Sequence, residues 1–143
     1  MNYQKIQVNT RGEKFYDITT QVRKCLDQIL QSSPSHSGIL HLFIKHTSAA
    51  LTINEAFDPS AAVDMQEFLK HLATPNLSFI THTTEGPDDS PSHMKSILLN
   101  NSLTIFIENK KLLLGQWQGI YLAEFRQSAH QREILIKFQS DPI

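Results

Sequence analysis

The side chains in this sequence best suited to chemistry lie in residues 82–93, which read HTTEGPDDSPSH. Two histidines enclose three acidic residues, Glu85, Asp88 and Asp89, around a Gly-Pro turn, and the stretch has almost no apolar residues to bury. Imidazoles beside carboxylates are the composition of a metal site or an acid–base site, and such groups concentrate on loops. The alternative interpretation is a solvated surface loop that merely contains histidines.

A further histidine, His46, ends the strongest strand pattern in the chain, residues 39–46. Because side chains alternate along a strand, His46 shares a face with Leu40, Leu42 and Ile44. An imidazole at the end of a buried row is costly unless its nitrogens find partners. We therefore expect His46 to be either a hydrogen-bonded core residue or a ligand presented at the edge of the sheet.

The composition is that of one globular domain, with 143 residues, 40% of them hydrophobic and 19% charged. A net charge of -1 with interspersed signs provides no basic stripe, so we expect no nucleic-acid binding, whereas small anions remain possible ligands. We expect no membrane span, because no apolar run approaches ~20 residues. The N-terminus lacks a signal-peptide pattern and the one cysteine, Cys25, can form no internal disulfide, which predicts a reducing, cytoplasmic setting.

The first part of the chain is predicted to form two short strands, over 6–8 and 14–18, joined as an opening hairpin. Thr19 or Thr20 can then cap a helix with a full apolar stripe. This stripe comprises Val22, Cys25, Leu26, Ile29 and Leu30. Because Cys25 lies in the middle of the stripe, we interpret it as a small buried hydrophobic residue rather than a reactive thiol.

Two proline-initiated helices are predicted farther along. Asp58-Pro59 begins one that stops before Pro75, and Ser90-Pro91 begins a shorter one. The predicted inner faces are Ala62, Met65, Phe68, Leu69 and Leu72 in the first helix, and Met94, Ile97 and Leu98 in the second. Strands are predicted near 76–80 and over 103–107, 112–114, 120–125 and 133–138. The whole pattern predicts a single α+β domain, residues 1–143, of mostly antiparallel sheet or sandwich with about three helices.

Five motifs follow one another in this chain: His46-Thr47-Ser48-Ala49, Asn54-Glu55 before Asp58-Pro59, His82, Asp88-Asp89 leading to His93, and the segment LGQWQGI at 114–120. With these motifs the chain, from about residue 39 to residue 138, resembles the YjbQ-like, or secondary thiamine-phosphate synthase, family. Five motifs in one order are far more specific than any one of them. The resemblance implies a compact α+β domain, a homotrimer, a metal-binding cluster of histidines and a weak thiamine-phosphate synthase activity.

Carried over to this sequence, the resemblance implies that His46, His82 and His93 bind one divalent metal ion, for which zinc is the best fit to histidine ligands. The implied catalytic companions are Ser48, Asn54, Glu55 and Asp88. The implied ligand is a small phosphorylated molecule. The chain departs from the family pattern over residues 124–132, which leaves the roles of Arg126 and Arg132 open.

Two hypotheses about function follow. In the first, three imidazoles hold an ion with an open position, and Glu55 or Asp88 handles a proton in a thiamine-phosphate synthase-like transfer. A pyrophosphate leaving group usually requires Mg²⁺ on oxygen ligands with Lys or Arg nearby, so a metal-assisted phosphate-ester hydrolase is chemically at least as natural. In the second hypothesis the protein is a non-catalytic trimeric module that binds a metal or a small anion.

The remaining side chains of interest are Trp117, within the last of these motifs, and three further histidines. Trp117 falls in a break between two strands, where we expect it to plug the end of the sheet rather than line a pocket. His36, His71 and His130 are expected to be exposed to solvent.

Overall fold

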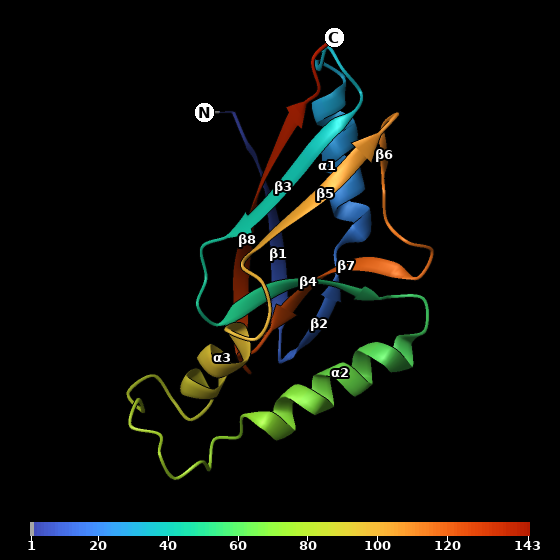
Figure 1. The fold of residues 1–143 in the computed structure, drawn as a ribbon. Coiled ribbons are helices and arrows are strands. Elements are labelled where there is room, and N and C mark those ends of the chain that lie inside the picture. The colour runs from blue at the N-terminus through green and yellow to red at the C-terminus, as the bar shows by residue number, and fades with distance from the viewer. Residues whose placement is uncertain (1) are drawn as a thin grey trace.

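The computed structural model describes residues 2–143, which form two antiparallel sheets and three helices (Figure 1). In chain order the elements are β1 (Gln4–Arg11), β2 (Lys14–Asp17), α1 (Thr19–Leu30), β3 (Gly38–Ile44), β4 (Ala49–Glu55), α2 (Pro59–Leu72), α3 (Asp89–Ser96), β5 (Ser102–Glu108), β6 (Lys111–Leu112), β7 (Gln118–Glu124) and β8 (Ala129–Ser140). One sheet has the order β1-β8-β3-β5-β6 and the other the order β2-β7-β4. The two sheets curl into a half-barrel, which confirms the predicted α+β domain.

The first two strands do not form the predicted hairpin. β1 pairs with β8 and β2 pairs with β7, so the turn between them carries the chain from one sheet to the other. Gly12 in this turn has a φ of 88°, a left-handed conformation that is unfavourable for residues other than glycine. The periodicity predicts these strands correctly but not their partners, which lie near the other end of the chain.

The main core lies between the sheets and beneath α1. The inward residues of β3 are fully buried, as their alternation predicts. The stripe of α1 is part of the same core, and burial raises the pKa of the Cys25 thiol, as expected of a buried hydrophobic residue. α1 is not capped by Thr19 or Thr20: Asp17 accepts hydrogen bonds from the backbone N–H and hydroxyl of Thr19, at 3.0 and 2.6 Å.

α2 begins as predicted but leaves most of its apolar side chains at the surface. The Asp58 side chain accepts a hydrogen bond from Ser60 N at 2.9 Å, in the manner of an N-cap. Of the predicted inner face only Leu69 is buried, whereas Phe68 and Leu72 are 63% and 50% exposed. Ala62 and Met65 are partly buried and pack against the same cluster as Leu69, so the predicted inner face is right for these three residues and wrong for Phe68 and Leu72.

α3 shows the same reversal more sharply. Its charged residue Lys95 is buried and donates to Glu13 Oε2 at 2.9 Å, while Ile97 and Leu98, which follow the helix, are 81% and 57% exposed. The sequence predicts the opposite arrangement. α3 is attached to the domain mainly by polar side chains, and the segment directly after it exposes apolar side chains.

Two smaller predictions are also wrong. Residues 76–80 form turns and no strand. Trp117 is 50% exposed and packs edge-on against Phe57 with ring centroids 4.8 Å apart, so it does not plug the sheet. His36 and His71 are exposed, as expected, whereas His130 is partly buried.

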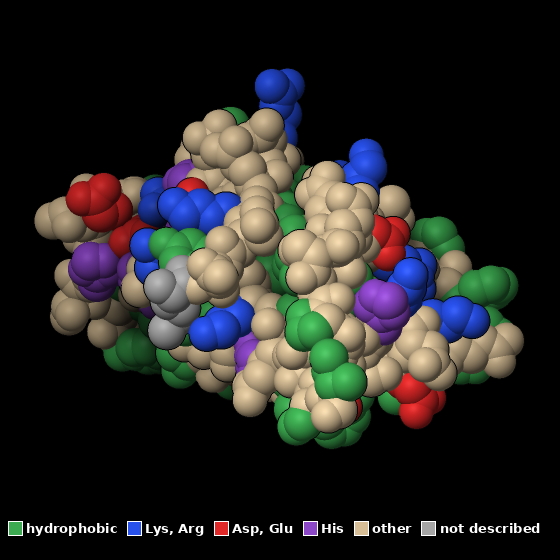
Figure 2. Space-filling view, turned by 90° about the horizontal axis from the view of Figure 1, so that it is seen from above, with side chains coloured by type: hydrophobic (Ala, Val, Ile, Leu, Met, Phe, Trp, Pro, Cys, Tyr) green, Lys and Arg blue, Asp and Glu red, His purple; other side chains and the backbone are tan. Residues whose placement is uncertain are grey.

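The surface carries charges of both signs. On the face seen in Figure 2, lysines and arginines are scattered among acidic, polar and apolar side chains. Over residues 2–143, no helix has both the length and the apolar character that crossing a bilayer requires.

Candidate metal and ligand site

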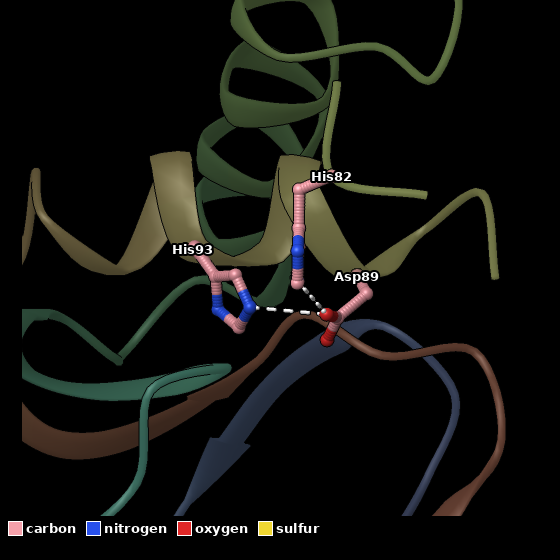
Figure 3. A group of neighbouring side chains, drawn as sticks. All are labelled: His82, Asp89 and His93. Atoms are coloured by element: carbon pink, nitrogen blue, oxygen red, sulfur yellow. Dashed lines mark hydrogen bonds and ion pairs between the residues drawn. The ribbon is translucent and has the colours of Figure 1, made fainter. Parts of the chain in front are cut away.

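Three candidate ligand atoms converge where the segment after α2 meets α3 (Figure 3). His82 Nε2 lies 2.8 Å, and His93 Nε2 3.1 Å, from the same atom, Asp89 Oδ2. Asp89 and His93 are one helical turn apart on α3, so one face of the helix presents both. All three ligand atoms lie within 4.8 Å of one another, close enough to share a metal ion.

Asp89 is an oriented and charged carboxylate. Its side chain is 7% exposed, and its second oxygen, Oδ1, accepts a hydrogen bond from Arg126 Nη1 at 2.7 Å. Burial by itself would raise the pKa of Asp89, but the hydrogen bond with His82 and the charges of His93 and Arg126 lower it overall. The carboxylate therefore faces the two histidines as an anion.

His93 lies between two groups that can only accept hydrogen bonds. Its Nδ1 is 2.7 Å from the carbonyl oxygen of Thr47, and its Nε2 faces the carboxylate of Asp89. The carbonyl requires a proton on Nδ1, which in a neutral ring leaves only a lone pair on Nε2. That lone pair would face a carboxylate oxygen at 3.1 Å, unless Nε2 also carries a proton or a cation lies between the two atoms. The geometry therefore favours a positive charge at Nε2.

A cavity of about 850 Å³ opens beside this cluster and is lined by His82 and His93. Its other polar lining includes His46, Asn100 and Asn101, and its apolar lining includes Ala50, Ile97 and Leu99. Among the described residues neither Lys nor Arg lines it. The volume suits a small molecule.

His46 lines the same cavity but lies outside the cluster of ligand atoms. Its Nε2 accepts a hydrogen bond from the backbone N–H of Glu133 at 3.0 Å, so the proton of the neutral ring is on Nδ1. Burial lowers the pKa of His46, and the charge of Arg132 lowers it further. The hydrogen-bond partner that the sequence predicts for this imidazole is therefore the backbone of Glu133, while the ring also lines the cavity.

Ser48 belongs to a buried network rather than to the cavity lining. Arg132 donates to both oxygens of Glu124, at 2.7 and 2.5 Å, and to Ser48 Oγ at 2.9 Å. Thr10 also donates to Glu124, at 2.5 Å. Burial by itself would raise the pKa of Glu124, but the hydrogen bonds from Arg132 and Thr10 lower it overall. This network joins β1, β7 and β8 behind His46.

Asn54 and Glu55 lie at the far end of β4 from the histidines. β4 begins at the cavity with Ala49, and six residues of strand span roughly 20 Å. The Glu55 carboxylate accepts the backbone N–H of Asp58 at 3.1 Å and so stabilises the turn before α2. Within one chain the structure does not bring these two predicted catalytic residues to the histidine cluster.

Asp88 lies behind Asp89 and orients Arg126. Its Oδ2 accepts from Arg126 Nε at 3.1 Å and from the backbone N–H of Gln127 at 2.8 Å. Burial opposes ionisation, but these hydrogen bonds lower the pKa of Asp88 overall. Arg126 also donates to the Glu85 carbonyl at 2.9 Å, so it holds the whole acidic loop.

Sequence reasoning missed the parts played by Asp89 and Arg126. The i,i+4 spacing of Asp89 and His93 on a predicted helix was an available signal for the first. No local signal identified Arg126, because it reaches the acidic loop from a segment that departs from the family pattern.

Comparison with known proteins gives a consistent result. Residues 4–141 match the family described as UPF0047 protein YjbQ-like. The UPF0047 protein YjbQ of Salmonella typhimurium is 38% identical over 143 residues, which cover 99% of this chain and 100% of that protein. A UPF0047 protein of Methanocaldococcus jannaschii is 40% identical over 138 residues, covering 96% of this chain and 94% of its own.

Solved structures share the fold. An uncharacterized conserved protein of the YjbQ/UPF0047 family from Clostridium acetobutylicum has a TM-score of 0.84 and 33% identity, covering 95% of this chain and 99% of its own. A conserved hypothetical protein from Thermus thermophilus has a TM-score of 0.82 and the same identity and coverage.

Proposed function

From the premise that this chain belongs to the UPF0047 protein YjbQ-like family, we propose that it binds a zinc-like divalent ion and acts on a small phosphorylated molecule. The ion would be held by His82, Asp89 and His93, beside the cavity. The observation that carries the proposal is the position of His93 between two acceptors. A cation at Nε2 lets Nδ1 keep its proton on the Thr47 carbonyl and removes the repulsion between two lone pairs.

The donor set fits such an ion. Two imidazole nitrogens and a carboxylate oxygen are common zinc ligands, and the hydrogen bond from the outer nitrogen of His93 to a carbonyl is the usual support for a metal-bound histidine. Ligand atoms around a tetrahedral zinc ion lie about 3.3 Å apart, and the contacts of 2.8 and 3.1 Å are close to that spacing. In this proposal Asp89 takes the place that the resemblance gave to His46.

The ion would supply a Lewis acid that polarises a phosphate group or lowers the pKa of bound water. The protein's own residues orient the ligands: Arg126 holds Asp89, and the Thr47 carbonyl holds His93. Since the cavity lining contains no Lys or Arg in the described chain, the charge of a phosphate would be balanced at the cluster. This favours a phosphate monoester over a pyrophosphate, so ester hydrolysis and weak thiamine-phosphate synthesis are both reactions to assay.

Metal analysis tests this site directly. After zinc loading and dialysis, the wild type is expected to retain about one zinc ion per chain, and His93→Ala and Asp89→Ala to lose it. His71→Ala is the matched control, because His71 is an exposed histidine on α2 whose Nδ1 contacts only the Glu67 carbonyl. Equal zinc content in the wild type and His93→Ala would refute the site.

A second candidate is a non-catalytic module that binds a metal or an anion. It is favoured by the placement of Asn54, Glu55 and Ser48, none of which lines the cavity of a single chain. Zinc-loaded protein that binds phosphate but turns over neither phosphate monoesters nor the substrates of thiamine-phosphate synthesis would support this candidate. Zinc-dependent turnover that is lost in His93→Ala would support the enzyme.

We also propose that the chain forms the homotrimer that the family resemblance implies. The support lies in the apolar side chains exposed on α2 and after α3, above all Phe68 and Ile97. Light scattering should give about three times the chain mass of 16.3 kDa. Ile97→Lys should lower this mass, whereas Ile143→Lys, a change at an even more exposed isoleucine outside these two segments, should not. A monomeric wild type at micromolar concentration would contradict the proposal.

A further inference from the structure

Backbone groups hold two histidines of the cavity in the same neutral tautomer, with the proton on Nδ1, but they engage different nitrogens of the two rings. The Thr47 carbonyl holds the proton of His93 on Nδ1, which turns the Nε2 lone pair toward the site of the proposed cation. The Glu133 N–H donates to Nε2 of His46 at 3.0 Å, which places the proton of this neutral ring on Nδ1 as well. The Nδ1–H of His46 is on the other side of the ring from this hydrogen bond. His93 therefore offers a lone pair, and His46 offers an N–H donor.

The Nδ1–H of His46 is available to a ligand. Among residues 2–143 it has no hydrogen-bond partner in the protein, and no buried side-chain nitrogen or oxygen lacks a partner, so Nδ1 is not sealed inside the domain. The ring lines the cavity that also contains His82 and His93. A donor without a partner, on the wall of a polar cavity, is suited to bind an oxygen atom of a ligand.

We infer that His46 is not a metal ligand but donates a hydrogen bond through Nδ1–H to an oxyanion, such as a phosphate group, bound in the cavity. The inference rests on the proposed function, since it takes the oxyanion to be bound at the proposed metal ion. It departs from the sequence-based prediction that His46 completes the ligand set.

The existing hydrogen bond argues against metal binding by either nitrogen. Binding through Nε2 would break the bond from Glu133 and leave its N–H without a partner. Binding through Nδ1 would remove the only proton of the ring and require an imidazolate. The backbone of Glu133 is also fixed, because it pairs with Gln7 of β1, the next residue Ile134 pairs with β3, and the adjacent Arg132 is bound to Glu124 and Ser48.

Nitrogen-detected tautomers test the inference in the intact wild type. With ¹⁵N-labelled histidine at about pH 8, where ordinary imidazoles are neutral, long-range ¹H–¹⁵N spectra should place the His46 proton on Nδ1. Zinc should shift the Nε2 signals of His82 and His93 to metal-bound values and leave both nitrogens of His46 unbound. Inorganic phosphate added to the zinc-loaded protein should then shift the Nδ1–H signal of His46. A metal-bound shift at either nitrogen of His46 would overturn the inference and leave the proposed metal function standing.

Two substitutions separate the donor from the metal site. His46→Asn retains an N–H near the position of Nδ1, whereas His46→Leu removes it. Both variants should retain zinc affinity within about threefold of the wild type, since the retained ligands dominate zinc binding. Phosphate affinity of the zinc-loaded protein should fall about tenfold in His46→Leu and recover in His46→Asn, the size expected for one hydrogen bond to a charged group.

The failures are distinguishable. If zinc shifts no histidine signal, the proposed metal function fails. The role of His46 is then tested by phosphate titration of the metal-free protein. If phosphate does not shift the Nδ1–H signal of His46 there, the inference is overturned as well. If zinc binds at His82 and His93 but phosphate affinity is the same in the wild type and His46→Leu, the inference alone is refuted.

Discussion

Two buried carboxylates in this protein, Asp89 and Glu124, each pair with an arginine, yet their surroundings differ. Glu124 is fully buried, and its hydrogen bonds come from Arg132, Thr10 and the backbone. Asp89 has one oxygen on Arg126 and turns the other toward two histidines beside a cavity. The partners of Glu124 are fixed groups of the fold, whereas Asp89 faces two imidazole rings, each of which can bind either a proton or a metal ion.

In the proposed function, this difference separates a carboxylate that serves stability from one that serves a ligand. Removing one partner of a buried ion pair costs much folding free energy, because the remaining charge is left unpaired and is not solvated by water. A carboxylate that meets imidazoles at a cavity is a common arrangement at functional sites. The comparison between Glu124 and Asp89 can be tested by changing each in turn.

The largest effect is expected for Glu124→Ala. Removing one partner leaves the Arg132 charge buried and unpaired, so the free energy of unfolding should fall by about 3–5 kcal/mol. Urea denaturation measures this loss. The double change Glu124→Leu with Arg132→Met should recover most of it, because no unpaired charge remains. A loss below about 1 kcal/mol for Glu124→Ala would show that the pair contributes no more than an exposed one.

Asp89→Asn should act more strongly on zinc affinity than on folding. The substitution keeps the shape of the side chain but removes the charge that faces His82 and His93, so zinc affinity should fall at least about tenfold. Competition with a chelator measures the affinity. Asp88→Asn is the matched control at the adjacent acid, and its effect should be smaller, because Asp88 contacts Arg126 and not the histidines. Equal losses in both variants would remove the distinction between the two acids.

A smaller effect is expected in the dependence of stability on pH. The folded-state pKa values of Glu124 and Asp89 are lowered from ordinary values of 4.5 and 3.8. Their stabilisation is therefore complete above those ordinary values and is lost as pH falls through them toward the lowered folded values. Each substitution should make the loss of stability with falling pH less steep. The effect of Glu124→Gln should begin at a higher pH than that of Asp89→Asn. Urea denaturation at a series of acidic pH values checks the order, and parallel curves for all three proteins would contradict it.

The sequence by itself determined the features that depend on local spacing. Alternation along β3 and the stripe of α1 predict the buried residues there, and Asp58-Pro59 predicts the start of α2. Asn109 and Lys110, between the strands predicted over 103–107 and 112–114, form the turn that joins β5 and β6, with φ values of 49° and 70°. The motif order also identified the family and directed attention to the acidic loop.

The tertiary structure alone decided which of these groups meet. Arg126 reaches Asp89 across 37 residues of sequence, and the N–H that sets the tautomer of His46 comes from Glu133, 87 residues away. The reversed burial of α3 likewise depends on Glu13 as the partner of Lys95. Periodicity reports which side of an element is apolar and which backbone angles a residue tolerates. It carries no information about the distant donor or acceptor that a polar side chain will find, and here that partner determines whether a histidine offers a lone pair or a proton.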